Sequence, residues 1–231
     1  RSNGILSLID GAHVPGQLPI SLTDLSPDFY VGNLHKWLFV PRAVSFLWVR
    51  EEHRQLLPLV ISHGYHSAQR FQDCFSWTGT RDMTARMCVP TALKFIEEHI
   101  GGLATLMEHN HQLICAVRDR MIEHWWPNTT ELKPAADLLG AMLTLPLPPR
   151  ITKRLPFSPD PIRIPAGTIH PLQNALYNRG FEVPIITWRN GLSNNGEPTM
   201  LIRVAAQVYC CLDDYRDLLA AIDEIVQCRS A

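Results

Sequence analysis

Three short apolar runs in the first fifty residues are typical of β-strands. They cover residues 4–10, 28–33 and 43–49, and the first ends in an Asp-Gly pair that favours a turn. Both faces of these runs are apolar, so they predict the interior of a mostly parallel sheet that is covered on both sides. Residues 51–80 show no clear periodicity, and we expect them to be irregular.

Two longer stretches carry apolar residues at three- and four-residue spacing, as amphipathic helices do. They cover residues 84–99 and 103–125, and Gly101 and Gly102 separate them. After Pro127 the pattern predicts a strand, a helix, two strands and a helix, at 141–147, 168–178, 181–187, 200–205 and 212–226, with a Pro-rich connector at 146–165. This order predicts a small α+β domain. We therefore expect an α/β chain with two domains, residues 1–125 and 126–231.

Composition and net charge argue against several classes of binding partner. The net charge is −1, without a long run of one sign, which argues against nucleic acid or an anionic membrane as a main partner. No apolar stretch approaches the roughly 20 residues that span a bilayer, and the N-terminus has no signal-peptide pattern. The six Cys form no CxxC pair, and a chain of this size does not need disulfides. Reduced thiols and a cytoplasmic location are expected.

Histidine pairs occur at 63 and 66 and at 109 and 111. Neither pair is accompanied by a cysteine or carboxylate pattern with metal-ligand spacing. The sequence therefore predicts no metal site.

Two polar residues stand directly beside the first two apolar runs. Asp10 ends the first run, and Lys36 follows the second in the sequence DFYVGNLHKW at 28–37. A pyridoxal phosphate enzyme needs such a pair: a lysine that forms a Schiff base with the cofactor aldehyde, and an acid that keeps the pyridine nitrogen protonated. The apolar neighbours of Lys36 are expected to bury it. A surface lysine and an acid that only caps a turn are the alternatives.

At these residues the chain resembles the fold-type I, class V aminotransferase superfamily. Within it, the chain is most similar to the isopenicillin N epimerase-like group, with cysteine lyases and desulfhydrases as near relatives. The resemblance implies the C-terminal part of a pyridoxal phosphate-binding large domain, followed by a small α+β domain. Compared with the family, about the first half is missing, so the chain is expected to be a fragment. In the family a Gly often stands where this chain has Ala43.

The resemblance also assigns residues to the cofactor. His13 corresponds to a position near the 3-hydroxyl, and Asn33 and His35 correspond to phosphate contacts. The segment WTGTRD at 77–82 is similar to the same group, and Thr80 is implied to reach the cofactor phosphate of a neighbouring subunit. This would make the protein a homodimer with shared active sites. A core histidine at 35 and a simple helix cap at 77–82 are the alternatives.

Arg203, in LIRVAA at 201–206, matches the small-domain arginine that holds the substrate carboxylate. A guanidinium fits a carboxylate through two parallel hydrogen bonds. An arginine within an apolar strand needs a partner, and a structural ion pair is the alternative.

These residues predict a pyridoxal phosphate enzyme that acts at Cα of an amino-acid substrate. Isopenicillin N-type epimerisation is the leading expectation. Cysteine desulfhydrase or C–S lyase activity and transamination are alternatives, because these reactions share their early steps. A truncated non-catalytic product, or a dimerisation module, is the rival from another class.

Overall fold

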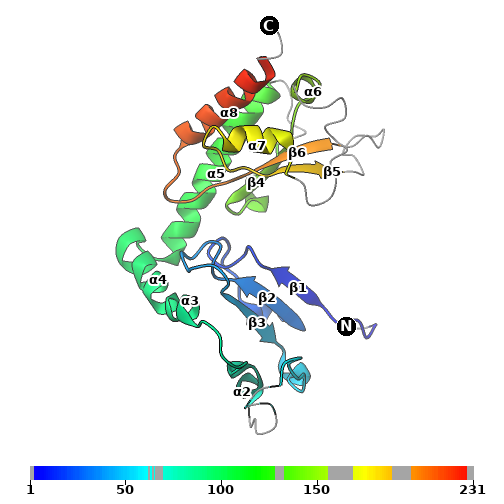
Figure 1. The fold of residues 1–231 in the computed structure, drawn as a ribbon, viewed down its shortest axis with the longest axis vertical. Coiled ribbons are helices and arrows are strands. Elements are labelled where there is room, and N and C mark those ends of the chain that lie inside the picture. Colours follow the sequence, from blue (N-terminus) through cyan, green and yellow to red (C-terminus); the bar gives the residue numbers. More distant parts are fainter. Residues whose placement is uncertain are drawn as a thin grey trace. The chain divides into compact units, whose positions relative to one another are not determined.

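The computed structural model describes residues 3–61, 63, 65, 70–127, 133–155, 169–188 and 199–227 (Figure 1). The chain splits into two compact units between Met107 and Glu108, inside its longest helix. The expected domain boundary at residue 125 assigns the whole of that helix to the first domain and stays a prediction.

The first unit contains a three-stranded sheet made by the three runs predicted as strands. β1 (Leu8–Gly11) pairs in parallel with β2 (Phe29–Asn33), and β2 pairs antiparallel with β3 (Ser45–Val49). The parallel arrangement is thus found for the first pair and not for the second. Because β1 and β2 are parallel, their carboxyl ends meet at the same edge of the sheet, where ligands bind in open α/β sheets.

Gly11 is required by the packing of Tyr30 across the parallel strand pair. Tyr30 is 1% exposed, stacks on Phe46 at a centroid distance of 5.9 Å, and donates a hydrogen bond to the Gly11 carbonyl at 3.5 Å. A Cβ atom at residue 11 would lie 2.0 Å from the Tyr30 hydroxyl oxygen. Only a residue without a side chain leaves the tyrosine in place.

We expect Gly11→Ala to lower the free energy of unfolding of the first unit by about 1–3 kcal/mol, the usual range for overpacking. Urea unfolding and hydrogen exchange of the β1 and β2 amides measure the loss. Combining the change with Tyr30→Leu, which makes room for the methyl group, should cost less than the sum of the two single changes. Additive losses would contradict the steric explanation.

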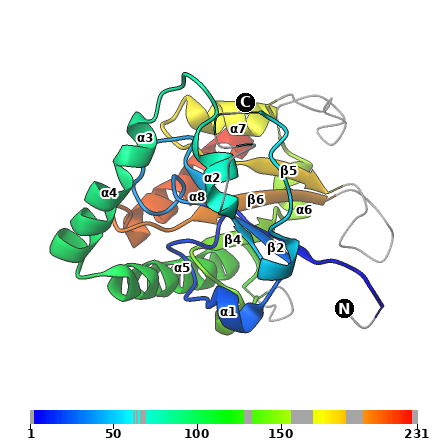
Figure 2. The same ribbon diagram turned by 90° about the horizontal axis from the view of Figure 1, so that it is seen from below.

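Short helical segments complete the first unit. They are α1 (Leu22–Leu25), η1 (Glu51–His53), α2 (Phe71–Ser76), α3 (Thr84–Met87), α4 (Val89–Phe95) and the π-helix η2 (Ile96–Ile100). The single helix expected at 84–99 is therefore a series of three. Gly101 and Gly102, with φ of +93° and +97°, end this series before α5 (Leu103–Trp125), as the sequence predicted. Figure 2 shows the succession from α3 to α5 from below.

The second unit is an antiparallel sheet with helices. Its elements are η3 (Ala136–Leu138), β4 (Met142–Pro146), α6 (Pro149–Thr152), α7 (Pro171–Tyr177), β5 (Ile185–Trp188), β6 (Thr199–Ala205) and α8 (Leu212–Gln227), and the strand order is β4-β6-β5. The predicted strand-helix-strand-strand-helix order is found. Residues 156–165 of the expected connector lie outside the described residues.

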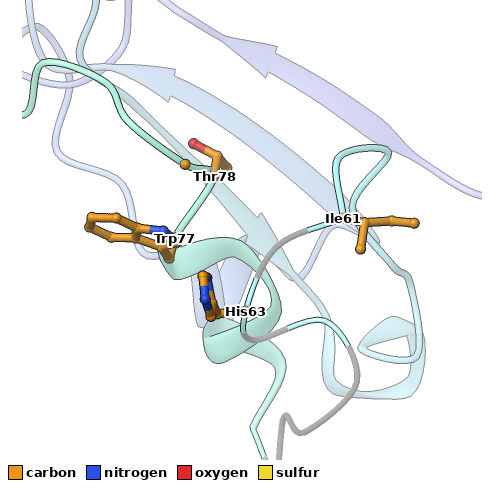
Figure 3. A pocket seen from close by; sticks show the side chains of 5 residues that line it. Ile61, His63, Trp77 and Thr78 are labelled. Atoms are coloured by element: carbon orange, nitrogen blue, oxygen red, sulfur yellow. The ribbon is translucent and has the colours of Figure 1, made fainter.

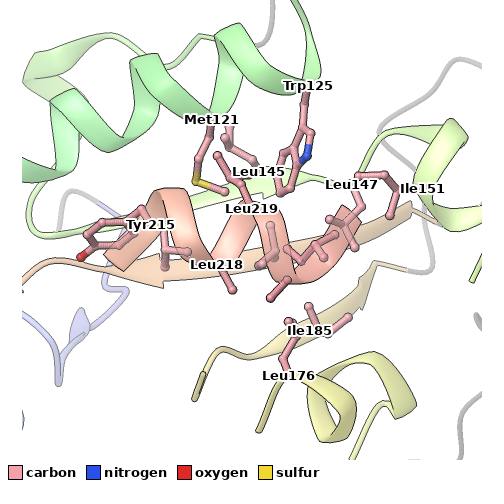
Figure 4. Close-up of a cluster of buried hydrophobic side chains, with 14 of the residues drawn as sticks. Met121, Trp125, Leu145, Leu147, Ile151, Leu176, Ile185, Tyr215, Leu218 and Leu219 are labelled. Atoms are coloured by element: carbon pink, nitrogen blue, oxygen red, sulfur yellow. The ribbon is translucent and has the colours of Figure 1, made fainter. Parts of the chain in front are cut away.

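The core of the second unit gathers apolar side chains from α5, α7, α8 and all three strands. Met121 and Trp125 of α5 approach Leu218 and Leu219 of α8 over the sheet (Figure 4). Ile202 at the centre of β6 is fully buried. This sheet fixes the backbone on which Arg203 stands.

Candidate active site

Lys36 lies in the loop between β2 and β3, at the carboxyl end of β2. Trp37 and Leu38 are each 6% exposed, whereas the Lys36 side chain is exposed. The expectation that the apolar neighbours bury the lysine is therefore wrong for this chain. The neighbours anchor the loop and leave the amine accessible.

His35 clamps this loop onto itself. Its Nδ1 lies 2.7 Å from the Val44 carbonyl oxygen and 3.2 Å from the Val44 backbone N, and the Leu34 N–H also donates to that carbonyl at 3.0 Å. The shorter contact indicates that Nδ1–H donates to the carbonyl. His35 thus has a structural role at Nδ1, and only Nε2 is left for the predicted phosphate contact.

His13 brings the turn after β1 against Lys36. Its Nε2 lies 2.9 Å from Lys36 Nζ, and its Nδ1 accepts a hydrogen bond from Trp37 Nε1 at 3.4 Å. The backbone around His13 is held by a Val14 N–H to Gly11 carbonyl bond and by the Gln17 side chain, which donates to the His13 carbonyl. Two residues that were assigned to the cofactor by resemblance are therefore in direct contact.

Asp10 is the last residue but one of β1, and it is exposed. Its Oδ1 accepts a hydrogen bond from the Ala12 N–H at 3.0 Å, so the turn-capping alternative describes one of its two oxygens. Oδ2 makes no hydrogen bond with any residue in the described part of the chain. Burial, and secondly the negative charge of Asp10, raise the pKa of the neighbouring Tyr30 hydroxyl.

Two residues without a glycine's freedom adopt left-handed backbone conformations just after Lys36. Phe39 has φ of +58° and Ala43 has φ of +73°. Such conformations cost roughly 1–2 kcal/mol per L-residue and are found at functional sites. The Ala43 conformation gives a physical reason for the glycine that relatives often have there, and it explains why β3 begins at Ser45 instead of residue 43.

We expect Ala43→Gly to raise the free energy of unfolding by up to about 1 kcal/mol, because glycine adopts positive φ without strain. Thermal unfolding would show a higher midpoint. Ala85→Gly, within the short helix α3, is the matched control and should destabilise by about 1 kcal/mol. A loss of stability at both positions would contradict the assigned strain.

Asn33 and Thr80 are the remaining predicted contacts for the phosphate. Asn33 ends β2 and pairs in register with Ser45. Thr80 is exposed, and the three residues before it, Trp77, Thr78 and Gly79, line a hollow of about 430 Å³ together with Ile61 and His63 (Figure 3). Both assignments stay predictions.

The segment after Thr80 carries its own turn. Asp82 accepts hydrogen bonds from the Thr84 backbone N–H at 2.8 Å and from the Thr84 hydroxyl, and these bonds lower the pKa of the Asp82 carboxyl. Arg81 donates to the Thr78 hydroxyl at 3.3 Å. The N-cap of α3 is Met83, which makes no side-chain capping bond, so Asp82 closes the turn before the helix and neither Asp82 nor Thr80 is the predicted capping residue.

Arg203 lies in β6 of the second unit, opposite Thr144 of β4, and is half-buried. Its backbone N–H donates to the Pro184 carbonyl at 3.1 Å. Its guanidinium forms no ion pair with a residue of the described ranges, so the structural ion-pair alternative has no partner there.

Asp28 forms a buried polar cluster that the sequence did not single out. Its carboxylate is 3% exposed and accepts hydrogen bonds from the Ser7 backbone N–H at 2.8 Å and the Ser7 hydroxyl at 2.9 Å. His53 Nε2 lies 3.1 Å away and Arg50 Nε 3.6 Å away. An Asp at the start of a predicted buried strand was the available signal, because a buried carboxylate requires partners.

Among the residues that the structure describes, no group of three or more His, Cys, Asp or Glu side chains is arranged to hold a metal ion. In the same residues, no helix is both long enough and apolar enough to cross a membrane.

Comparisons with known proteins show which family this chain is similar to. Residues 1–138 match the family model for class V aminotransferases. An L-cysteine desulfhydrase-like protein, lolT1, from Epichloe uncinata is 29% identical over 93% of this chain and 53% of its own length. An isopenicillin N epimerase from Amycolatopsis lactamdurans is 32% identical over 64% of this chain and 40% of its own length.

A solved cysteine desulfurase from Thermococcus onnurineus NA1 has the same fold, with a TM-score of 0.63 and 17% identity over 98% of this chain and 54% of that one. The expected fold class is thereby confirmed. This chain spans about half the length of the relatives it matches. Class V aminotransferases are pyridoxal phosphate enzymes, which confirms the expected cofactor. Because the family model covers more than half of its residues, the chain belongs to the class V aminotransferase family.

Proposed function

We propose that this chain carries the cofactor-anchoring lysine and the substrate-binding arginine of a pyridoxal phosphate enzyme that acts at Cα of an amino acid. The observation that carries the proposal is the 2.9 Å contact between Lys36 Nζ and His13 Nε2 at the carboxyl edge of the β1–β2 pair. Ligands of open α/β sheets bind at the carboxyl ends of the strands, and the exposed Lys36 amine lies at this edge.

The donor set fits pyridoxal phosphate. The Lys36 amine is accessible to an aldehyde, and Asp10 retains an oxygen that can accept from a pyridine N–H. His13 supplies a ring nitrogen for the 3-hydroxyl. Asn33, His35 through Nε2, and Thr80 from a second copy are the proposed phosphate contacts. When bound, the cofactor supplies a conjugated ring that withdraws electrons from the bonds at Cα.

The proposed roles of the protein residues follow from their charge and position. Lys36 holds the cofactor and then moves the proton at Cα. The Asp10 carboxylate stabilises positive charge on the ring nitrogen. Arg203 orients the substrate through its carboxylate, which a planar guanidinium binds at two points. The homodimer with shared sites and the cytoplasmic location belong to the same proposal.

Two reactions remain candidates for the physiological one. Epimerisation requires that the Cα proton return on the opposite face, and desulfhydration requires loss of a thiol from Cβ. The desulfhydrase-like relative is 29% identical over 93% of this chain, and the epimerase is 32% identical over 64% of it. The wider match and the higher identity balance each other, so the two relatives support desulfhydration and epimerisation equally.

The test is to add pyridoxal phosphate to the purified chain, reduce with borohydride and map the labelled peptides. We expect a visible absorbance band and one label, on Lys36, with Lys94, Lys133 and Lys153 unlabelled as internal controls. Label spread over all four lysines, or none, would contradict the proposal. Sulfide release from L-cysteine, or a change in optical rotation with L- and D-amino acids, then separates the two reactions.

A further inference from the structure

Lys36 lies in a short helical turn, residues 34–38, that ends at a strained residue. The turn is closed by a hydrogen bond from the Leu38 N–H to the Leu34 carbonyl, which at 3.3 Å is long for such a bond. Phe39 follows with φ of +58°, although a left-handed residue at the end of a helical turn is usually glycine. A phenylalanine keeps this conformation only where its surroundings hold it. The position of Lys36 therefore depends on what holds Phe39.

The ring of Phe95 contacts the ring of Phe39. The two ring centroids are 5.5 Å apart, and the rings meet edge to face at an interplanar angle of 70°. Phe95 is the last residue of α4, and the next residue, Ile96, is 1% exposed and begins the π-helix η2. Because Ile96 is buried, it anchors the backbone that carries Phe95. An edge-to-face aromatic pair stabilises by about as much as a left-handed L-residue costs, so this contact is strong enough to offset the strain at Phe39.

The residues on both sides of Phe39 are fixed by burial. Leu38 is 6% exposed and Val40 is 5% exposed. Gly16 packs so closely on the turn that a Cβ atom there would lie 2.8 Å from Leu38 Cδ2. The Phe39 side chain is itself half-buried, and Phe95 is the aromatic side chain that meets it.

We propose that Phe95 is a positioning residue: its ring holds Phe39 in the left-handed conformation, which keeps the turn closed and the Lys36 amine against His13. Without the ring, Phe39 leaves this conformation more often, and the turn opens at its long hydrogen bond. Lys36 Nζ then moves away from His13 Nε2, which lies 2.9 Å from it in the closed turn. This geometry concerns the chain without cofactor, and its value for cofactor attachment rests on the proposed function.

Four variants of the full chain separate positioning from general packing. Phe95→Leu removes the ring and keeps an apolar side chain at a helical position that is 44% exposed. Phe95→Tyr keeps the ring. Phe39→Gly, added to Phe95→Leu, supplies a residue that adopts positive φ without any ring contact. Phe71→Leu is the matched control, because Phe71 forms a comparable pair with Phe75 in α2, at 4.8 Å.

The first measurement is hydrogen exchange of the Leu38 amide without cofactor, relative to the amides of β2. We expect Phe95→Leu to raise the relative rate about two- to tenfold, the effect of one aromatic pair. Phe95→Tyr and Phe71→Leu should leave the rate unchanged. The added Phe39→Gly should restore slow exchange, whereas a packing role predicts a further loss, because glycine packs less than phenylalanine.

The second measurement is the nuclear Overhauser signal between the Lys36 ε-methylene and the His13 ring. We expect it to weaken in Phe95→Leu and to recover in the double variant with Phe39→Gly. With pyridoxal phosphate below saturation, borohydride labelling of Lys36 should fall and recover in the same variants.

Unchanged Leu38 exchange in Phe95→Leu, or faster exchange in place of recovery in the double variant, would overturn the proposal. So would the absence of an Overhauser signal between the Phe39 and Phe95 rings in the natural chain, which needs no variant to fold. If the natural chain fails to label Lys36 while exchange and the Overhauser signals change as expected, the proposed function fails and the positioning role stands.

Discussion

Lys36→Ala should abolish the single-site attachment of pyridoxal phosphate to this chain. Among the residues that the structure describes, no other lysine has an imidazole nitrogen at 2.9 Å and lies at the carboxyl edge of the parallel pair. In an active preparation, the loss of a residue that moves the Cα proton should lower turnover by at least about 10²- to 10⁴-fold, the usual contribution of such a group. Borohydride reduction followed by peptide mapping checks the first effect, and substrate turnover checks the second.

Lys94→Ala is the matched control for this variant. Lys94 lies on α4, and its exposed pair with Glu98 at 3.5 Å contributes little to stability. It should keep the Lys36 label at full yield. If Lys36→Ala still gave one dominant labelled lysine, the anchor would lie elsewhere and the proposed function would lose its central residue.

Asp28→Ala should lower the free energy of unfolding of the first unit by about 3–5 kcal/mol. Removing one member of a buried ionic and hydrogen-bonded cluster leaves buried polar groups without their partner, and this cost exceeds the net value of the intact contact. Here the Ser7 backbone N–H and hydroxyl would lose their acceptor, and Arg50 would lose its buried ion pair, although it keeps hydrogen bonds to the Pro27 carbonyl. Urea unfolding and hydrogen exchange of the β1 and β2 amides provide the measurement.

Asp24→Ala removes a carboxylate from an exposed position in α1 and serves as the control. We expect it to change stability by no more than about 0.5 kcal/mol. Asp28→Asn keeps the shape and one acceptor oxygen, so its effect should fall between the two. Equal stabilities for Asp28→Ala and Asp24→Ala would show that the buried cluster does not stabilise the unit.

The sequence predicted the element order well because apolar periodicity is a local signal. The predicted ends of the strands were less accurate where the backbone conformation of one residue determines where a strand begins. Residues 43–44 were assigned to a strand from their apolar character, and the left-handed Ala43 excludes the first of them. The strand predicted at 181–187 begins at Ile185, directly after Pro184, which has no N–H to donate to a sheet.

The candidate site was harder to predict from the sequence, since its contacts join residues far apart in the chain. The family resemblance identified Lys36 and His13 separately, and only the fold brings them to 2.9 Å. The contact between Trp37 and His13 depends on which edge of the indole faces the imidazole, and no sequence pattern encodes that. The clamp of His35 on Val44 was likewise hidden, because its acceptor is a backbone carbonyl.

The hydrogen bond between the His35 ring and the Val44 backbone carbonyl determines which substitutions the loop can accept during evolution. At residue 44 the loop uses the peptide carbonyl, so any apolar side chain that fills the same buried volume preserves the hydrogen bond. At residue 35 it uses the imidazole itself, and few replacements offer a ring donor at that reach. Sequence drift should therefore be free among aliphatic residues at 44 and narrow at 35, although both residues make the same bond.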